Sequence, residues 1–251
     1  MKHLYKYDMH CHVKEGSDDS AVTGEEYIKA LVNNGFHGFA ITDHNSFSGF
    51  EYIENNLKDK YPNLCILKGI EYDSLDAGHV LVFMKDGFDG NYLTKRGSKL
   101  IDVIEYVHKN GGILGPAHPF SEPYLAIFNS IKYKEEDSIY QYFDFVEVLN
   151  GGEKKEENTK AKEYAKKHDL VMFGGSDSHH IERCGATYTE FEEIIHTNNE
   201  LIDYVKKHKN TIVGGSEYLN IDRDKYDRFG KLLYSFHHLE NIYYSVLNKL
   251  K

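Results

Sequence analysis

The feature that most constrains the fold is an alternation of short apolar segments with helical patterns, in which several apolar segments run directly into histidine, aspartate or glutamate. Segments such as Phe39–Ile41 and Phe145–Leu149 are short and continuously apolar, which is typical of buried strands. Their recurrence predicts a repeated strand–helix plan around one core. With 251 residues and no linker or repeat, the chain has the length of one α/β barrel. We therefore expect residues 1–251 to form a single domain.

The first apolar segment, Tyr5–His12, ends in two histidines separated by Cys11. Because side chains alternate across a strand, His10 and His12 should point to one side and Cys11 to the other. This geometry suits a metal ion, although two ordinary histidines at a strand end would give the same pattern. The choice between these interpretations depends on the other strand ends.

Later apolar segments also end in potential ligands. In a βα barrel, functional side chains lie where strands give way to loops at the carboxyl-terminal face. The residues at such ends are His10, His12, His44, Glu71, His118, Asp177 and His179. We expect these seven side chains to converge on one site.

Composition excludes several classes of protein. The formal net charge of −10 disfavours an extended nucleic-acid groove, because long-range electrostatics would repel a polyanion. Three widely spaced cysteines argue against a disulfide framework. Neither end carries an apolar run long enough for a signal peptide or a membrane span. We expect a cytoplasmic protein that does not enter the membrane.

Two regions outside the predicted strands have their own expected structures. Residues 121–142 are interpreted as a helical excursion beside the site, and residues 226–250 as a C-terminal helix rich in aromatic residues. The C-terminal helix carries an apolar stripe at helical spacing, made of Leu232, Leu233, Phe236, Leu239, Tyr243, Val246 and Leu250. Packing on the barrel is the preferred interpretation of this stripe, and a homodimer contact is the alternative.

Five motifs, in this order, resemble those of the PHP family of polymerase and histidinol phosphatase metallohydrolases. They are Asp8-x-His10-x-His12, Ile41-Thr42-Asp43-His44, Gly69-Ile70-Glu71, Ala117-His118-Pro119 and Gly175-Ser176-Asp177-Ser178-His179. The resemblance covers nearly the whole chain. It implies a distorted seven-stranded (β/α)7 TIM-like barrel, open on one side, with two or three divalent ions at its carboxyl-terminal face.

The resemblance also implies a set of ligands. His10, His12, Glu71 and Asp177 would hold one ion; Glu71, His79 and His118 a second; and Asp18, His44 and His179 a third. Two of these positions have alternatives: Asp19 could replace Asp18, and His79 could simply be a polar residue that opens a strand.

A mixture of imidazole and carboxylate ligands suits Mn, Fe or Zn. Three divalent ions among three carboxylates would give the site a charge of roughly +3, which would attract a phosphate dianion. Asp8 and Asp43 are expected to orient ligand histidines. Arg183 is a candidate phosphate clamp or a surface arginine, and His180 a candidate proton donor or an exposed histidine. Lys14 has the same two alternatives. Glu147 and Asn150 line the pocket or pack its floor.

The expected function is hydrolysis of a small phosphomonoester, nucleotide-like or histidinol-phosphate-like, by a metal-bridged water. One alternative is an amidohydrolase-type metal-dependent hydrolase, which also places His-x-His on an early strand. A second alternative is a non-catalytic metal-binding PHP module. Phosphatase activity that is lost on chelation and restored by Mn separates the first reading from the other two.

Overall fold

The computed structural model describes residues 3–121, 125–130, 132–208 and 210–216, together with Leu239, Ile242, Tyr243 and Val246. The strands are β1 (Tyr5–Cys11), β2 (Gly38–Ile41), β3 (Cys65–Ser74), β4 (Gly78–Phe83), β5 (Ile113–Pro116), β6 (Phe145–Asn150), β7 (Val171–Gly175), β8 (Thr187–Phe191) and β9 (Thr211–Gly215). The α-helices are α1 (Gly24–Asn33), α2 (Ser48–Asn56), α3 (Leu100–Lys109), α4 (Lys155–Lys167) and α5 (Asn198–Lys206). Four short 3-10 helices are η1 (Lys58–Lys60), η2 (Ile127–Asn129), η3 (Asp137–Tyr142) and η4 (Ile181–Arg183).

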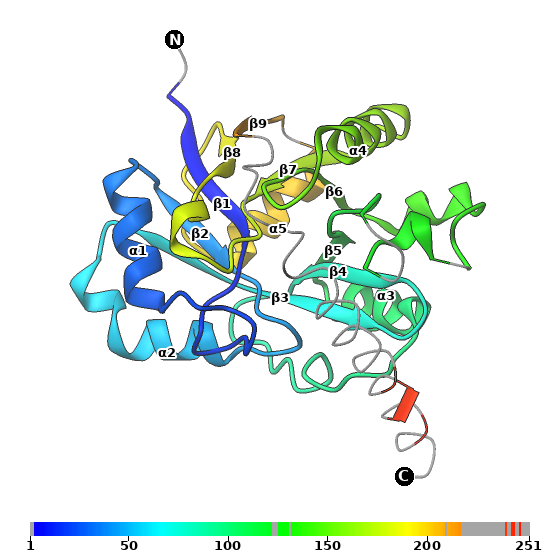
Figure 1. The fold of residues 1–251 in the computed structure, drawn as a ribbon, viewed down its shortest axis with the longest axis horizontal. Coiled ribbons are helices and arrows are strands. Elements are labelled where there is room, and N and C mark those ends of the chain that lie inside the picture. The colour runs from blue at the N-terminus through cyan, green and yellow to red at the C-terminus, as the bar shows by residue number, and fades with distance from the viewer. Residues whose placement is uncertain are drawn as a thin grey trace.

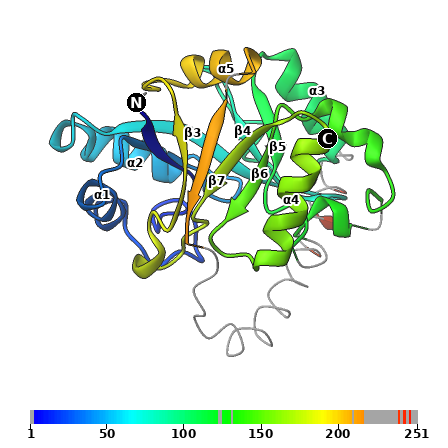
Figure 2. The same cartoon turned by 90° about the horizontal axis from the view of Figure 1, so that it is seen from above.

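The strands form a curled sheet with helices around its outside (Figures 1 and 2). Seven strands pair in the order β5-β4-β3-β2-β1-β8-β9, and β6 pairs with β7 in a second sheet. The second sheet is linked to the first at both of its sides. The Asp144 N–H donates to the Leu114 carbonyl at 2.9 Å on the β5 side, and Cys11 forms a parallel bridge with Ser178 on the β1 side. The mixed α/β, barrel-like architecture is therefore confirmed.

Strict alternation of strand and helix is not found. The pairs β1–β2, β2–β3 and β6–β7 are parallel, whereas β3–β4, β4–β5 and β1–β8 are antiparallel. Only residues 75–77 connect β3 to β4. A connection this short permits a hairpin, since a parallel crossover needs a dozen or more residues. The start of β4 therefore lies beside the end of β3, where Asp73 pairs with His79.

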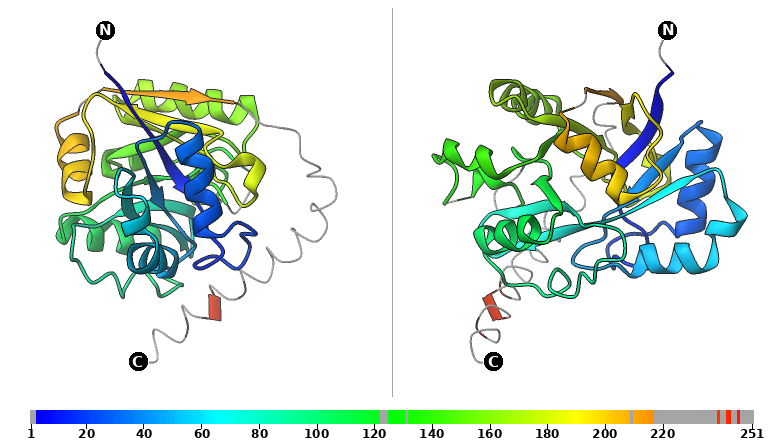
Figure 3. Two further views of the ribbon diagram at one scale, coloured as in Figure 1. Left: turned by 90° about the vertical axis from the view of Figure 1, so that its left-hand side faces the viewer. Right: turned by 180° about the vertical axis from the view of Figure 1, so that it is seen from behind.

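The end of the barrel opposite the carboxyl-terminal strand ends is filled by apolar side chains. Tyr7, Phe83 and Phe173 are fully buried there, in one cluster with Leu201 and Val205 of α5. The Tyr7 hydroxyl donates to the Ile195 carbonyl at 3.0 Å, just before α5. Figure 3 shows α5 against the strands and β1 beside β8. This closure leaves the opposite end for the polar residues.

Helix α1 begins as the sequence predicts. The Thr23 hydroxyl accepts the Glu26 N–H at 3.3 Å, and the Glu26 carboxylate accepts the Thr23 N–H at 3.0 Å, which together form a capping box. Tyr27, Ile28 and Leu31 are fully buried on one face of this helix. The helix therefore packs an apolar stripe against β1 and β2, in the cluster that contains Cys11 and Phe39.

The two regions predicted outside the strands have different outcomes. Within residues 121–142, the described part contains only the short 3-10 helices η2 and η3, so a longer helical excursion is not found there. The predicted helix at 226–250 lies outside the described residues except for Leu239, Ile242, Tyr243 and Val246, which are helical and 43–60% exposed. The preferred packing of this stripe on the barrel stays a prediction, as does the homodimer contact.

All three cysteines are buried and unpaired, as expected for a chain without a disulfide framework. In the part of the chain that the structure describes, no helix combines the length and apolar character needed to cross a membrane.

Candidate metal centre

Four side chains form the buried centre of the site. The Nε2 atoms of His10 and His12 lie 3.1 Å apart, and Oε2 of Glu71 lies 3.2 Å from each of them. Oδ1 of Asp177 is 3.5 Å from the first nitrogen and 3.2 Å from the second. Four ligands around a tetrahedral ion would be about 3.4 Å apart. The spacing of these donor atoms is therefore that of a preformed cation site.

Glu71 is shared between this group and its neighbours. Its Oε1 atom lies 2.9 Å from Nδ1 of His79 and 3.0 Å from Nε2 of His118. Its Oε2 atom lies 3.2 Å from Nδ1 of His44, in addition to the two nitrogens of β1. One carboxylate thus faces five imidazoles. His79 reaches it from the start of a strand because β4 runs antiparallel to β3.

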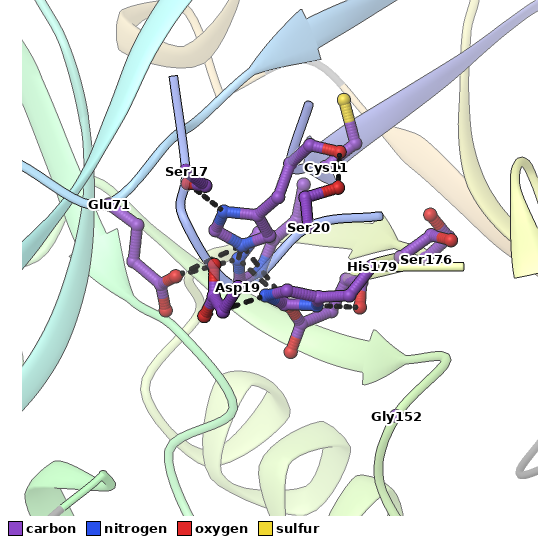
Figure 4. A network of polar contacts seen from close by, with 12 residues as sticks. Cys11, Ser17, Asp19, Ser20, Glu71, Gly152, Ser176 and His179 are labelled. Carbon is purple, nitrogen blue, oxygen red and sulfur yellow. Dashed lines mark hydrogen bonds and ion pairs between the residues drawn. The ribbon is translucent and has the colours of Figure 1, made fainter. Parts of the chain in front are cut away.

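A third group lies at the open edge of the site. Oδ2 of Asp19 is 3.4 Å from Nε2 of His44 and 3.3 Å from Nε2 of His179. The His12 ring stacks with each of these two imidazoles, with ring centroids 4.5 and 4.3 Å away. In Figure 4, Glu71 and His179 approach the centre from opposite sides, with Asp19 between them. The Asp19 side chain is 54% exposed, so this group is the one open to solvent.

Asp19, and not the predicted Asp18, occupies this position. The Ser20 N–H donates to the Ser17 carbonyl at 3.1 Å, so the two aspartates are the central residues of a tight turn. Successive side chains diverge in such a turn, and the side chain of Asp18 is exposed. The structure therefore corrects the register by one residue, and the remaining eight predicted ligands converge as expected.

The carboxylates of the site raise the pKa of two buried imidazoles. Burial acts to lower the pKa of His12, but Asp177 and Glu71 raise it to about 10. Burial also acts to lower the pKa of His118, but the neighbouring Glu71 raises it to about 9. Burial would raise the pKa of Glu71, yet His79 and His10 hold it well below its usual range. Protons on the histidines thus compensate buried carboxylates, which divalent cations would do equally well.

The unsatisfied atoms of the site fit metal ions. Among the described residues, Oε2 of Glu71 and Nδ1 of His118 are buried without a hydrogen bond of good geometry. Buried polar atoms are rarely left in this state. Three sets of donor atoms also lie close enough to hold an ion, namely His10, His12, Glu71 and Asp177; His44, Glu71 and His79; and His12, His44 and His179. Imidazole with carboxylate is a donor mixture suited to Mn, Fe or Zn.

Known proteins share this fold and, in one segment, this sequence. A protein named PsfC from Pseudomonas syringae is similar over 94% of this chain and 98% of its own, with a TM-score of 0.64 and 16% identity. A Bifidobacterium adolescentis protein assigned as a metal-dependent phosphoesterase is similar over 81% of this chain and 96% of its own, with a TM-score of 0.54 and 17% identity. A family model described as PHP-associated matches residues 155–210. The resemblance to the PHP family is confirmed.

Two further solved structures have a similar fold. Endonuclease Q, solved with a 27-mer duplex that carries an abasic lesion, is similar over 86% of this chain and 60% of its own, with a TM-score of 0.61 and 16% identity. An amidohydrolase from Chromobacterium violaceum, solved with sulfate and no metal, covers 79% of this chain and 96% of its own, with a TM-score of 0.56 and 15% identity. At these identities the likeness concerns the fold alone.

A curated relative, the uncharacterized protein MJ0417 of Methanocaldococcus jannaschii, is 35% identical over 114 residues. The match covers 43% of this chain and 47% of that protein, so the chain matches about half the length of the relative. Its name assigns no activity.

The two aspartates expected to orient ligand histidines make hydrogen bonds to backbone N–H groups, including that of His10, and to a hydroxyl. Asp8 accepts the Tyr27 hydroxyl at 2.6 Å and the Ser176 N–H at 2.9 Å, which ties β1 to α1 and to the end of β7. Asp43 accepts the Val13 N–H at 2.9 Å. Its Oδ2 atom is so close to two glycines that a Cβ on Gly16 or Gly49 would lie 1.9 or 2.0 Å away. Asp8 therefore joins β1 to its neighbours, and Asp43 fixes the start of the loop after β1. Burial raises the pKa of Asp43 to about 6.

Other residues make the contacts to the imidazoles. The Ser17 hydroxyl lies 3.3 Å from Nδ1 of His12 and accepts the His44 N–H at 3.1 Å. Glu147 lies 2.9 Å from Nδ1 of His10. From the sequence, Glu147 and Asn150 are assigned only to the lining or the floor of the pocket, and Ser17 is given no role. Glu147 and Asn150 lie in β6 and Ser17 lies in the loop after β1, and these positions alone do not reveal a partner.

The remaining candidates lie on the segment after β7. His180 is exposed, and Arg183 is partly exposed at the end of η4. Both lie in a tight turn that directly follows His179, in which the Arg183 N–H donates to the His180 carbonyl at 3.0 Å. The segment therefore lies beside the third, open group. The roles suggested for His180, Arg183 and Lys14 stay predictions.

Proposed function

We propose that the chain is a metal-dependent phosphoesterase that hydrolyses a small phosphomonoester, nucleotide-like or histidinol-phosphate-like. The observation that carries this proposal is the arrangement around Glu71, whose two oxygens face separate sets of imidazoles within 3.2 Å. A carboxylate shared in this way suits adjacent divalent ions. A site with two or more divalent ions is a recurrent arrangement for displacement at phosphorus.

In this proposal three groups of residues hold the ions. His10, His12, Glu71 and Asp177 hold the first, Glu71, His79 and His118 the second, and Asp19, His44 and His179 the third. Bound Mn, Fe or Zn would supply Lewis-acid activation of water and of a phosphoryl oxygen. Counting Glu147 with the three ligand carboxylates, the filled site would carry roughly +2, which favours a phosphate dianion.

The chain's own residues set where the substrate approaches. The first group is closed, since the His10 and His12 side chains are fully buried. The third group is accessible, because the side chains of His44 and His179 are 20% and 24% exposed. The phosphoryl group would enter from this side. Arg183 would contact its oxygens as a guanidinium fork, and His180 would donate a proton to the leaving group.

The size and charge of the substrate follow from the rest of the molecule. The formal net charge of −10 disfavours long polyanions, which supports a small substrate over a nucleic acid. The amidohydrolase with a related fold was solved with bound sulfate, a tetrahedral anion like phosphate. That fold relative also keeps amide hydrolysis as the second candidate, and Endonuclease Q does the same for DNA cleavage.

The test compares substrates on one metal-stripped preparation. p-Nitrophenyl phosphate, a nucleoside monophosphate and histidinol phosphate should be hydrolysed after addition of Mn, Fe or Zn, and the activity should disappear with a chelator. An aryl amide and a duplex with an abasic site are supplied in parallel. Faster turnover of either would replace phosphomonoester hydrolysis as the function, and no turnover of any substrate would favour a non-catalytic module.

Replacement of the shared carboxylate tests the assignment to this site. Glu71→Gln should lower phosphatase activity by at least about a hundredfold, because a neutral amide cannot compensate two cations. Bound metal, measured by inductively coupled plasma mass spectrometry, should fall with it. Glu51→Gln, an exposed residue of α2, serves as the matched control and should keep both. Full activity in Glu71→Gln would show that the reaction takes place in another part of the chain.

A further inference from the structure

A buried carboxylate outside the ligand set connects several ligands. Glu147 lies in β6 and is 1% exposed. Its Oε1 atom is 2.9 Å from Nδ1 of His10. Its Oε2 atom accepts the His118 N–H at 2.7 Å and an Nδ2 hydrogen of Asn150 at 3.0 Å. The carboxylate therefore faces three donors at once, two of which belong to residues of different ion groups.

Asn150 extends this connection to a further ligand. Its Nδ2 atom also donates to Oδ2 of Asp177 at 3.1 Å, so both amide hydrogens have acceptors. Its Oδ1 atom accepts the Gly152 N–H at 2.7 Å. Its backbone N–H donates to Oδ1 of Asn158, a buried residue of α4, at 2.9 Å. The asparagine side chain is thus fixed on every polar atom.

The backbone of two ligands depends on neighbouring hydrogen bonds. His118 has φ 27° and Asp177 has φ 49°, in the left-handed region that non-glycine residues rarely adopt. The His118 N–H is held by Glu147, and the Asp177 N–H donates to the His10 carbonyl at 2.8 Å. Such conformations persist only where the surroundings over-determine them. Contacts from β6 and β1 provide that constraint here.

We propose that Glu147 is the positioning residue of the metal centre. By accepting the Nδ1 hydrogen of His10, it keeps the lone pair on Nε2, which faces Glu71, His12 and Asp177. Through its second oxygen it fixes His118, and through Asn150 it fixes Asp177. Carboxylate partners of this kind orient ligand imidazoles and raise their basicity. The inference rests on the proposed metal function, and it assigns metal affinity, not the chemical step, to this residue.

The test is the substitution Glu147→Gln, which keeps the shape of the side chain. A carboxylate accepts from all three donors, whereas an amide has only one acceptor oxygen. In either orientation, its NH2 group must face an N–H donor of His10, His118 or Asn150. Affinity of the metal-stripped protein for Mn²⁺, measured by isothermal titration calorimetry, should fall about 10- to 100-fold. The visible spectrum of the Co²⁺-loaded protein should change as the geometry at His10 relaxes.

The matched control is Glu153→Gln, which changes another buried glutamate on the same segment. Glu153 is 5% exposed and accepts the Ser121 hydroxyl at 2.7 Å. Its variant should bind Mn²⁺ within about threefold of the protein with the natural sequence, since the hydrogen bond to Ser121 does not orient a ligand imidazole. Equal losses in both glutamine variants would overturn the proposal, as would unchanged affinity and an unchanged Co²⁺ spectrum in Glu147→Gln.

A second variant decides the matter if Glu147→Gln does not fold, which circular dichroism of the metal-free protein would show. Asn150→Ala keeps the contact between Glu147 and His10 but removes the link to Asp177. It should weaken Mn²⁺ binding by a smaller factor, about 3- to 10-fold, and wild-type affinity in this variant would overturn the proposal. If the protein without substitutions binds no Mn, Fe or Zn, that result would instead contradict the proposed function.

Discussion

At the scale of single residues, the loop after β1 decides which of two adjacent aspartates enters the site. The Ser17–Ser20 turn directs Asp19 toward His44 and His179 and leaves Asp18 in solvent. Partial desolvation acts to raise the pKa of Asp19, but these two imidazoles hold it well below its usual range. The carboxylate is therefore ionised at neutral pH, in the form that binds a cation.

This difference predicts unequal effects for two otherwise equal substitutions. Asp19→Asn should lower phosphatase activity by about tenfold or more, because one ligand of the open group loses its charge. Asp18→Asn should stay within about twofold. Both variants remove one negative charge one residue apart, so long-range electrostatics cancel in the comparison. Measured kcat/KM values that fall equally, or fall more in Asp18→Asn, would restore the register expected from sequence.

Prediction of single residues from sequence succeeds where a potential metal ligand also lies near the end of a predicted strand. His10 lies near the end of β1 and Asp177 just after β7, and the fold brings them together with Glu71, which lies inside β3 because that strand continues to Ser74. Asp19 was misjudged because the direction of a side chain in a turn is set by backbone torsion angles, which a run of two aspartates does not encode. Glu147 had no assigned partner, since His10 is brought close only by the tertiary fold. The contact of Ser17 with His12 is local, but it depends on the course of the loop after β1.

At the scale of secondary-structure elements, the β3–β4 hairpin places His79 in the site. The turn between the strands ends at Gly78, which has φ +72°. A Cβ atom at this position would lie 2.4 Å from the backbone carbon and oxygen of Leu125. The adjacent His79 N–H donates to that same Leu125 carbonyl at 3.0 Å. Position 78 therefore requires glycine both for its torsion angle and for its close contact.

Substitution of this glycine should weaken both the hairpin and the site. Gly78→Ala should lower the free energy of unfolding by about 2–4 kcal/mol, from the left-handed conformation and the contact with Leu125. Gly87→Ala is the matched control, because Gly87 has φ +71° with nothing within 4 Å of its Cβ position, and should cost only about 1 kcal/mol. Urea denaturation measures both. Equal costs would show that the contact with Leu125 relaxes without penalty.

Element-scale prediction was accurate where the signal is local. Thr23 and Glu26 form the expected capping box, and the strands before His44 and Asp177 are found, whereas β3 continues beyond Glu71 to Ser74. Strand direction was not predictable from apolar runs, because parallel and antiparallel strands can carry the same residues. The three-residue connection before Gly78 was the available indication of a hairpin.

At the scale of the whole molecule, an acidic chain encloses a site built to hold cations. The formal net charge is −10, yet the described site gathers six imidazoles against four carboxylates, which are Asp19, Glu71, Glu147 and Asp177. In the metal-free protein, protonated histidines would stabilise this arrangement. Metal loading would replace these protons, so stability, metal binding and pH are linked.

The sign of that linkage gives the last prediction. The pKa values of His12 and His118 are raised from 6.5 to about 10 and about 9 in the folded chain. A raised pKa contributes stability that is fully present below the unfolded value and is lost as pH rises through the folded value. The Tm of the metal-free protein should therefore fall as pH rises from about 6.5 to 9. Glu71 and Asp177, whose pKa values are lowered, act only in the acid range.

The metal-loaded protein should not share this fall, because cations compensate the carboxylates after the histidines deprotonate. Thermal unfolding of both forms at the two ends of this pH range gives the comparison, with the gap in Tm widening as pH rises. Proton release on adding Mn²⁺, measured in weak buffer, should be larger near pH 6.5 than near pH 9, since more imidazole protons remain to be displaced. A metal-free Tm that stays level across the range would mean that the buried imidazoles are already neutral, and that the carboxylates are held without their charge.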